Sequence, residues 1–314
     1  MSDHFFHIGL HKTATSTLQK EFFPACNGLN LLLARIPAVR DFTNYVIAKD
    51  PVHFDPEIAT GLLKPHVTDK SPNLLSFENL SGPPFTGIHH GVDYRTPILH
   101  KLKRSHPKAG IILVIRRQDS LAKSFYRQYV KTGGTASISR FYGWTGPRWR
   151  MAMASPDRFR FGPYLAELDG LFGDNILVMP FEAFKDDCHG FLKRMTEFVG
   201  VEMPDVALSQ RNATRLGPFG MELTRFLNRI SPFRSQVRED GLLPGVPIMQ
   251  RLGGFRWSNP ISLAHDHWPK LRKPPTEKEN RYYGICREIL ELVKGDNEEI
   301  DRKYGLGLHK FGYY

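Results

Sequence analysis

The amino-acid sequence predicts an α/β fold of three layers, in which a largely parallel sheet is flanked by helices on both faces. Over the first two-thirds of the 314 residues, short apolar runs alternate with segments of helical periodicity, the pattern of strands joined by crossover helices. Near the N-terminus, one such run leads into a loop of small and hydroxyl-bearing residues that opens a helix. The hydrophobic fraction of 41% is ordinary for a globular protein, and the chain is long enough to bury a sizeable core.

Five short apolar runs are the expected strands, and seven segments with helical periodicity are the expected helices. The expected strands are residues 5–9, 29–33, 74–77, 111–115 and 176–179. The expected helices are residues 16–23, 93–104, 120–131, 163–172, 187–199, 220–229 and 276–293. Open parallel sheets bind ligands outside the carboxyl ends of their strands, so the residues that follow each strand are candidates for a site.

The length allows one large α/β domain or two small ones, and we expect a single domain over residues 1–314. The chain has no internal repeat and no low-complexity tract. Residues 231–275 are rich in proline, glycine and arginine and lack periodicity. They predict an irregular insertion of the kind that serves as a lid or an acceptor loop.

No segment has the character of a membrane span or a signal peptide. The longest aliphatic run covers only residues 111–115, and the N-terminus lacks a basic region followed by an apolar stretch. The three cysteines, Cys26, Cys188 and Cys286, are odd in number and scattered, which argues against a disulfide framework. We therefore expect a cytoplasmic protein with no membrane span; the sequence does not indicate its oligomeric state.

The positive charge is concentrated in one part of the chain. Residues 101–150 hold twelve Lys or Arg and one acid, Asp119, so this window carries the whole net charge of +11. A localised cationic region indicates an anionic ligand, and a solvated basic face is the alternative.

The first motif, residues 7–18 (HIGLHKTATSTL), follows a short apolar strand and opens a helix. Backbone N–H groups at a helix start favour an anion, and the Thr and Ser side chains add hydroxyl donors. Lys12 supplies a compact cationic charge among them. The alternative is an N-cap segment rich in Ser and Thr with an incidental lysine. The segment is not a Walker A loop, because Lys12 comes three residues after Gly9 and no second glycine precedes it.

The second motif is an apolar strand that ends in Arg116 and Arg117, where a nucleotide triphosphatase usually places a magnesium-binding aspartate. Arginine forks match phosphate oxygens with paired hydrogen bonds. In the next helix, Ser120, Ser124 and Gln128 share a polar face at i, i+4 spacing. Ser124 can therefore reach an anion held by Arg116, and the alternative is an exposed serine on an amphipathic helix.

The two motifs resemble those of sulfotransferases that use 3′-phosphoadenosine 5′-phosphosulfate (PAPS). Residues 12–18 are similar to the family's 5′-phosphosulfate loop, usually written Lys-Thr-Gly-Thr-Thr/Ser-x-Leu. Arg116, with Ser124 eight residues on, resembles the family's 3′-phosphate site. Residues 164–182 look like the family's later helix–strand segment. Residues 296–305 look similar to the C-termini of bacterial-type carbohydrate sulfotransferases, so the resemblance extends over most of the chain outside the expected insertion.

One residue departs from the family's pattern. Ala14 stands where the family prefers glycine. A positive φ at this position would strain an alanine, whereas a helical backbone accepts a methyl group. We expect the helical backbone and keep the loop assignment.

The resemblance implies a P-loop-like fold similar to that of nucleotide kinases, with PAPS as sulfuryl donor and 3′-phosphoadenosine 5′-phosphate (PAP) as product. The residues that it assigns to the phosphosulfate are Lys12, Thr13, Ala14, Thr15, Ser16 and Thr17. Those that it assigns to the 3′-phosphate are Arg116 and Ser124. Lys12 is also placed to stabilise the leaving bridging oxygen, as fixed cations do in phosphoryl transfer. The implied acceptor is a hydroxyl or amine of a small molecule or a glycan.

Glu78 is the candidate catalytic base. It follows the expected strand 74–77, so it can lie beside the other two motifs at the carboxyl edge of the sheet. There it can take the proton of the acceptor. The alternative is a loop or capping carboxylate, and His11, His89 and His90 are then the next candidates for the base.

Two other classes of protein stay open. A P-loop-like metabolite kinase shares the predicted fold, but it needs a Walker loop and a metal-binding carboxylate. A module that binds nucleic acid or another polyanion explains the basic window, but it does not explain cations and hydroxyls at strand-to-helix turns. We therefore expect no nucleic-acid partner. With Arg116 and Arg117 in place of a metal ligand, we also expect no metal cofactor.

Overall fold

The computed structural model describes residues 3–82, 95–143, 154, 156–209, 217–230 and 277–314. The expected insertion at 231–275 and the candidate bases His89 and His90 lie outside the described residues.

All five expected strands are confirmed, with ends that shift by one or two residues. They are β1 (His4–His7), β2 (Asn30–Leu33), β3 (Asn73–Ser76), β4 (Gly110–Ile115) and β5 (Ile176–Pro180). The described strands form one parallel sheet in the order β2-β3-β1-β4-β5. Because β1 lies between β3 and β4, the segments that leave these three strands start side by side at one edge of the sheet.

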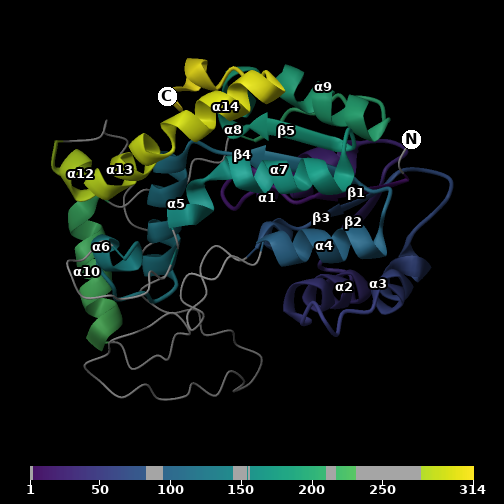
Figure 1. Ribbon diagram of the computed structural model, residues 1–314, viewed down its shortest axis with the longest axis horizontal. Coiled ribbons are helices and arrows are strands. Elements are labelled where there is room, and N and C mark those ends of the chain that lie inside the picture. The colour runs from purple at the N-terminus through teal and green to yellow at the C-terminus, as the bar shows by residue number, and fades with distance from the viewer. Residues whose placement is uncertain (1–2, 83–94, 144–153, 155, 210–216, 231–276) are drawn as a thin grey trace.

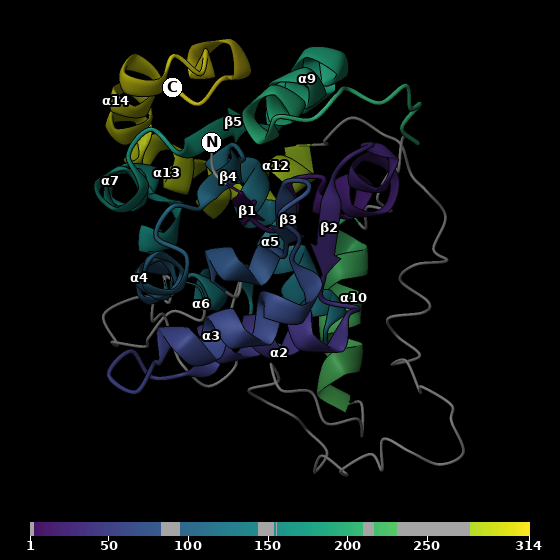
Figure 2. The same ribbon diagram turned by 90° about the vertical axis from the view of Figure 1, so that its right-hand side faces the viewer.

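The strands alternate their buried side chains between two separate cores, which makes the fold a three-layer sandwich. On one face, Phe6, Leu75 and Leu113 pack against α2 (Pro37–Ala48), α3 (Pro56–Leu63), α4 (Arg95–Ser105) and α7 (Phe161–Phe172). Figures 1 and 2 show α2, α3, α4 and α7 stacked on this side. The predicted flanking of a parallel sheet by helices is confirmed.

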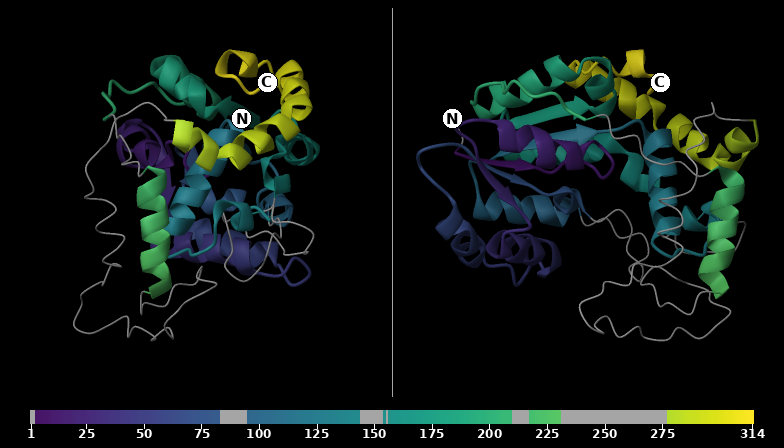
Figure 3. Two further views of the ribbon diagram at one scale, coloured as in Figure 1. Left: turned by 90° about the vertical axis from the view of Figure 1, so that its left-hand side faces the viewer. Right: turned by 180° about the vertical axis from the view of Figure 1, so that it is seen from behind.

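The opposite face of the sheet has a smaller core. Here Phe5, Leu74 and Ile112 pack against the helical run that follows the first loop and against α9 (Cys188–Val199). Seen from behind in Figure 3, the first helical run lies across the sheet and α9 lies next to it. The short α8 (Phe181–Asp186) connects β5 to α9 on the same side.

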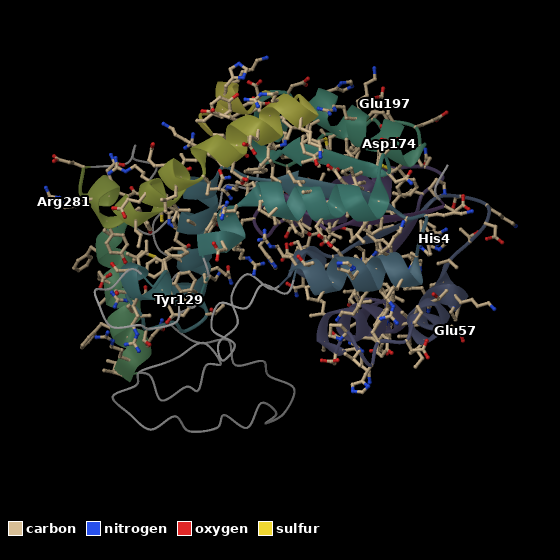
Figure 4. The ribbon with its side chains drawn as sticks, in the orientation of Figure 1. His4, Glu57, Tyr129, Asp174, Glu197 and Arg281 are labelled. Atoms are coloured by element: carbon tan, nitrogen blue, oxygen red, sulfur yellow. The ribbon has the colours of Figure 1, made fainter. Side chains whose placement is uncertain are left out.

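A group of helices stands beyond the carboxyl ends of the strands. The central one is α5 (Gln118–Lys131), which follows β4, and α10 (Pro218–Ile230) and α13 (Gly284–Leu292) pack against it. In Figure 4, His4 and Asp174, which mark the amino ends of β1 and β5, lie on the right. Tyr129 of α5 and Arg281 of α12 (Glu277–Tyr282) lie on the left. The strands thus point toward α5.

Two expected helices differ from the structure. The segment 16–23 is not one α-helix: α1 covers only Thr15–Thr17 and continues as a π-helix (Leu18–Phe22) and a 3₁₀ turn (Phe23–Ala25). A proline at position 24 lacks the N–H that a regular α-helix needs, which accounts for the 3₁₀ end. The segment 276–293 breaks at Tyr283 into α12 and α13, and α14 (Lys294–Tyr304) follows.

Several described helices were not expected from periodicity: α2, α3, α6 (Ile138–Phe141), α8 and α14. The first two carry a recognisable start signal, because each begins with a proline at its first position, and Asp55 caps α3 by accepting from the N–H of Glu57. Of the described helices, none combines the length and apolar character that crossing a bilayer requires.

Candidate functional site

Two side-chain contacts join the three central strand ends. After β4, the Arg116 guanidinium donates to the carbonyl oxygen of Lys12 in the loop after β1, at 2.7 Å. After β3, the Glu78 carboxylate lies 3.3 Å from Nδ1 of His11, which precedes Lys12. The three candidate segments predicted from the sequence therefore meet at the carboxyl edge of the sheet.

The loop after β1 first continues the sheet and then turns sharply. The N–H groups of Ile8 and Leu10 donate to carbonyls of β4 at 2.9 and 3.1 Å. Lys12 and Ala14 then adopt positive φ values of 69° and 62°. The expectation of a right-handed helical backbone at Ala14 is wrong. Left-handed backbone costs an alanine about 1–2 kcal/mol, so the loop keeps this shape against local strain.

The loop hydroxyls differ in what they can still bind. The Thr13 hydroxyl donates to the carbonyl of Leu10 and thereby holds the turn together. Thr15 is only 3% exposed, and its Oγ1 has no hydrogen-bond partner among the described residues. Ser16 is exposed and Thr17 is half-buried. A buried hydroxyl without a partner costs about 1–3 kcal/mol, so an anionic oxygen bound in this loop would satisfy a donor that the fold leaves unsatisfied.

Lys12 points toward the polar face of α5. Its ammonium donates to Oε1 of Gln128 at 2.8 Å. Burial lowers the pKa of Lys12, and the positive charges of Lys131 and Arg116 act in the same direction, while the charge of Glu78 opposes them. Positive charges brought close together indicate a place where an anion would be stabilised.

The polar face of α5 faces the loop, as its i, i+4 spacing predicted. Ser120 accepts from Nη2 and Nε of Arg116 at 2.6 and 3.1 Å, and Gln128 bonds Lys12. Ser124 is half-buried one turn from each of them. The structure thus places Ser124 between the contacts of Arg116 and Lys12. Ser120 and Gln128, which the sequence showed only as neighbours on this face, are themselves contacts of the site.

The two strand-end arginines turn in different directions. Arg116 faces the loop and stacks on the ring of Phe181 at 5.1 Å. Arg117 binds the Asp119 carboxylate at 2.7 Å and the carbonyl of Phe311 near the C-terminus at 3.0 Å. Only Arg116 is therefore directed at the candidate anion site, a distinction that the adjacent residues in the sequence do not reveal.

Glu78 is held in its charged form. Burial would raise the pKa of its carboxyl, but the hydrogen bond from His11 and the positive charges of His11 and Lys12 outweigh burial, and the pKa lies below its ordinary value. Its side chain remains 38% exposed, so it can meet a ligand. The ring of His11 is buried beside Phe125, and His11 Nε2 has no hydrogen-bond partner in the described part of the chain.

The residues present fit an anionic nucleotide better than a metal ion. Lys12 and the unsatisfied Thr15 hydroxyl belong to the loop, and Arg116 contacts it. Such donors suit phosphate or sulfate oxygens. Asp119, the carboxylate nearest to the strand-end arginines, is engaged by Arg117 and by Lys123 at 3.3 Å. Within the described ranges, no cluster of three or more His, Cys, Asp and Glu side chains is arranged to hold a metal.

Comparison with known proteins finds likeness only in structure. No family model and no curated protein matches the chain. A sulfotransferase from Alicyclobacillus acidocaldarius is similar with a TM-score of 0.47 and 16% identity, over 72% of this chain and 91% of that one. The mouse sulfotransferase SULT7A1 complexed with PAP is similar with a TM-score of 0.38 and 13% identity, over 94% of this chain and 87% of that one.

Proposed function

We propose that the protein is a sulfotransferase that moves a sulfuryl group from PAPS to a hydroxyl or amine and releases PAP. The observation that carries the proposal is the contact of Arg116 with the Lys12 carbonyl, because it holds the strand-end cation against the loop that bears the other cation. This contact supports a single site made of the two motifs that resemble the sulfotransferase family. The bound donor supplies the sulfuryl group.

The residues of the loop bind and orient the 5′-phosphosulfate. Thr15 donates its unsatisfied hydroxyl to an anionic oxygen, and the exposed Ser16 and half-buried Thr17 offer further donors. Lys12 leaves Gln128 and places its ammonium where negative charge develops on the leaving oxygen. Thr13 and Ala14 shape the turn that presents these groups.

Arg116 and Ser124 bind the 3′-phosphate. The guanidinium already lies between the loop and α5, and Ser124 is on the α5 face that Arg116 contacts through Ser120. A charged hydrogen bond of this kind contributes about 1.5–3 kcal/mol. Recognition of the 3′-phosphate distinguishes PAP and PAPS from ordinary adenine nucleotides.

Glu78 takes the proton of the acceptor, and His11 orients the carboxylate for this step. Nδ1 of His11 donates to Oε1 of Glu78, which fixes the carboxylate and keeps it ionised at neutral pH. On the resemblance to bacterial-type carbohydrate sulfotransferases, the acceptor is a carbohydrate or glycoconjugate in the cytoplasm. We propose that the enzyme needs no metal ion and that it does not bind nucleic acid.

Thermal unfolding with different ligands tests the proposal. PAP at about 100 times its dissociation constant should stabilise the folded chain by about 2.7 kcal/mol, while ATP with Mg²⁺ and adenosine 5′-monophosphate should give little or no shift. If ATP with Mg²⁺ raises the unfolding temperature and PAP does not, the result would favour the metabolite kinase. A shift for a sulfated polyanion but not for PAP would favour the polyanion-binding module.

A further inference from the structure

Beneath the anion loop, His7, the first residue of the first motif, joins Ser76 and Gln19 in a chain of hydrogen bonds, and neither motif includes the latter two. His7 ends β1 and is fully buried, and its Nδ1 lies 2.7 Å from Oγ of Ser76. Ser76 ends β3 and is the register partner of His7. Gln19, on the π-helix after the loop, bonds from Nε2 to the Ser76 carbonyl at 2.9 Å and to its Oγ at 3.1 Å.

The donors and acceptors of this chain favour one arrangement of its protons, in which the role of His7 Nδ1 follows from the roles of its neighbours. The Ser76 carbonyl only accepts, so Gln19 presents its NH₂ group, whose second hydrogen serves Ser76 Oγ. The Ser76 hydroxyl must then place its own proton elsewhere. In the described part of the chain its remaining partner is Nδ1 of His7. In this arrangement Nδ1 accepts, and a neutral His7 carries its proton on Nε2, which has no hydrogen-bond partner among the described residues.

The His7 ring supports the underside of the loop. A Cβ atom on Gly9 would lie 2.9 Å from Nε2 of His7 and 3.2 Å from Oγ1 of Thr13, so the ring and the loop are in close contact there. Phe23 packs edge-on against the same ring at 5.4 Å. Burial lowers the pKa of His7 to about 4 against the opposing charge of Glu78, so the ring is neutral at physiological pH.

We infer that His7, Ser76 and Gln19 are positioning residues that lock the anion loop to the end of β3. In this lock, the side-chain N–H of Gln19 donates to Oγ of Ser76, and the Ser76 hydroxyl donates to Nδ1 of His7. His7 carries its own proton on Nε2. Glu78 follows Ser76 by two residues, so the same lock sets the distance between the loop that binds the donor and the carboxylate that faces the acceptor. This role in turnover rests on the proposed function, whereas the proton arrangement does not.

Nitrogen NMR of the histidine-labelled full chain tests the proton arrangement directly. The wild-type protein should show His7 as the Nε2–H tautomer. Gln19→Met removes the donor that orients the Ser76 hydroxyl, so a second tautomer should become populated. A wild-type His7 protonated on Nδ1, or a tautomer that Gln19→Met leaves unchanged, would overturn the inference.

Kinetics test the positioning role with a matched control. Ser76→Ala should lower kcat by about 10-fold or more, with little change in PAP affinity, because a small displacement of reacting groups is costly. Ser76→Thr keeps the hydroxyl and should restore most of the activity. Ser105→Ala is the control, since Ser105 is likewise a buried serine bonded to a buried histidine, His106, at 3.0 Å.

The kinetic outcomes separate the inference from the proposed function. If Ser76→Ala changes kcat no more than Ser105→Ala does, the positioning role is wrong although the enzyme is a sulfotransferase. If the wild-type protein neither binds PAP nor transfers a sulfuryl group, the proposed function fails, and the tautomer measurement still decides the proton arrangement.

Discussion

Ala14 has a backbone conformation that alanine rarely adopts. Its backbone is left-handed, with φ 62° and ψ 10°, a region that glycine enters at no steric cost. Lys12, two residues earlier, is left-handed as well, and these are the non-glycine residues with positive φ in the described part of the chain. Strain of this kind is typical of functional turns, which agrees with the choice of this loop as the candidate site.

The strain at Ala14 predicts that Ala14→Gly stabilises the protein. Glycine removes a steric cost of about 1–2 kcal/mol and adds an entropic cost of about 0.5–1 kcal/mol, so the net gain should reach about 1 kcal/mol. Denaturant unfolding measures it. The control is Ala166→Gly, at an exposed position within α7, which should lose about 1 kcal/mol. A loss for Ala14→Gly equal to that control would contradict a left-handed loop.

The His11–Glu78 contact predicts how activity depends on pH. The pKa of Glu78 is lowered in the folded protein, so the base is fully ionised above its ordinary pKa and activity falls only as the pH drops through the lowered value. His11→Phe removes the hydrogen bond and leaves burial as the main influence. The pKa of Glu78 should then rise, and the acid limb of kcat/KM should move to higher pH.

Two variants control this experiment. His11→Asn keeps a side-chain N–H near the position of Nδ1, so the acid limb of kcat/KM should return part of the way to its wild-type pH. His100→Phe removes a distant His–Glu contact and should leave the acid limb at its wild-type pH. Glu78→Gln should abolish the limb and lower turnover by about 10²-fold or more. An acid limb that survives in Glu78→Gln would exclude Glu78 as the base.

The junction between β4 and α5 is the element that organises the site. It sends Arg116 toward the loop and Arg117 toward the C-terminal segment, where Arg117 bonds Phe311 and Glu182 bonds Tyr313. The first turn of α5 also carries Gln118, which exchanges hydrogen bonds with Asn297 of α14. One junction therefore directs two identical side chains to different places, Arg116 to the candidate anion site and Arg117 to the C-terminal segment.

Because Arg116 and Arg117 have different contacts, replacing each of them with alanine should have a different effect. Arg116→Ala should weaken PAP binding by about 1.5–3 kcal/mol, and it should affect adenosine 5′-phosphosulfate, which lacks the 3′-phosphate, much less. Ser124→Ala should act in the same direction. Arg117→Ala should instead lower the free energy of unfolding while keeping the preference for PAP. Calorimetric titration with both nucleotides checks this, and equal losses for both in Arg116→Ala would remove it from the 3′-phosphate site.

At the scale of the whole molecule, the sheet brings cations to the edge where related folds use a metal. The order β2-β3-β1-β4-β5 places the strand end that carries Arg116 next to the loop that carries Lys12. Fixed cations in that position can stabilise the developing charge of a sulfuryl transfer. They would also repel a divalent cation.

The proposed enzyme should therefore work without a divalent metal. PAPS-dependent transfer measured in excess EDTA, after metal has been stripped from the protein, should retain the activity of the untreated protein. Asp119, the carboxylate that follows the two strand-end arginines, is held by Arg117 and Lys123 and should not bind Mg²⁺ in their place. Activity that disappears with EDTA and returns with Mg²⁺ would favour the kinase.

The layers of the fold and the segments of the candidate site could be predicted from the sequence. Short apolar runs report strands because burial on both faces of a parallel sheet leaves few polar positions, as in β4. Hydrophobic periodicity did not predict α2 and α3. The signal for these helices is the proline at the first position of each, Pro37 and Pro56, because its fixed φ suits the start of a helix. Lys12 and Arg116 could be named as candidates because functional groups follow strand ends in such folds.

Only the tertiary structure decided which side chains act together. The contact of Lys12 with Gln128 joins residues 116 positions apart, and the roles of Arg116 and Arg117 differ only in the direction that each side chain takes. The left-handed backbone at Ala14, against its own preference, is likewise imposed by the packed elements on either side of the loop. Periodicity and propensity describe neighbours along the chain, whereas these choices depend on free energies between segments that the sheet brings together.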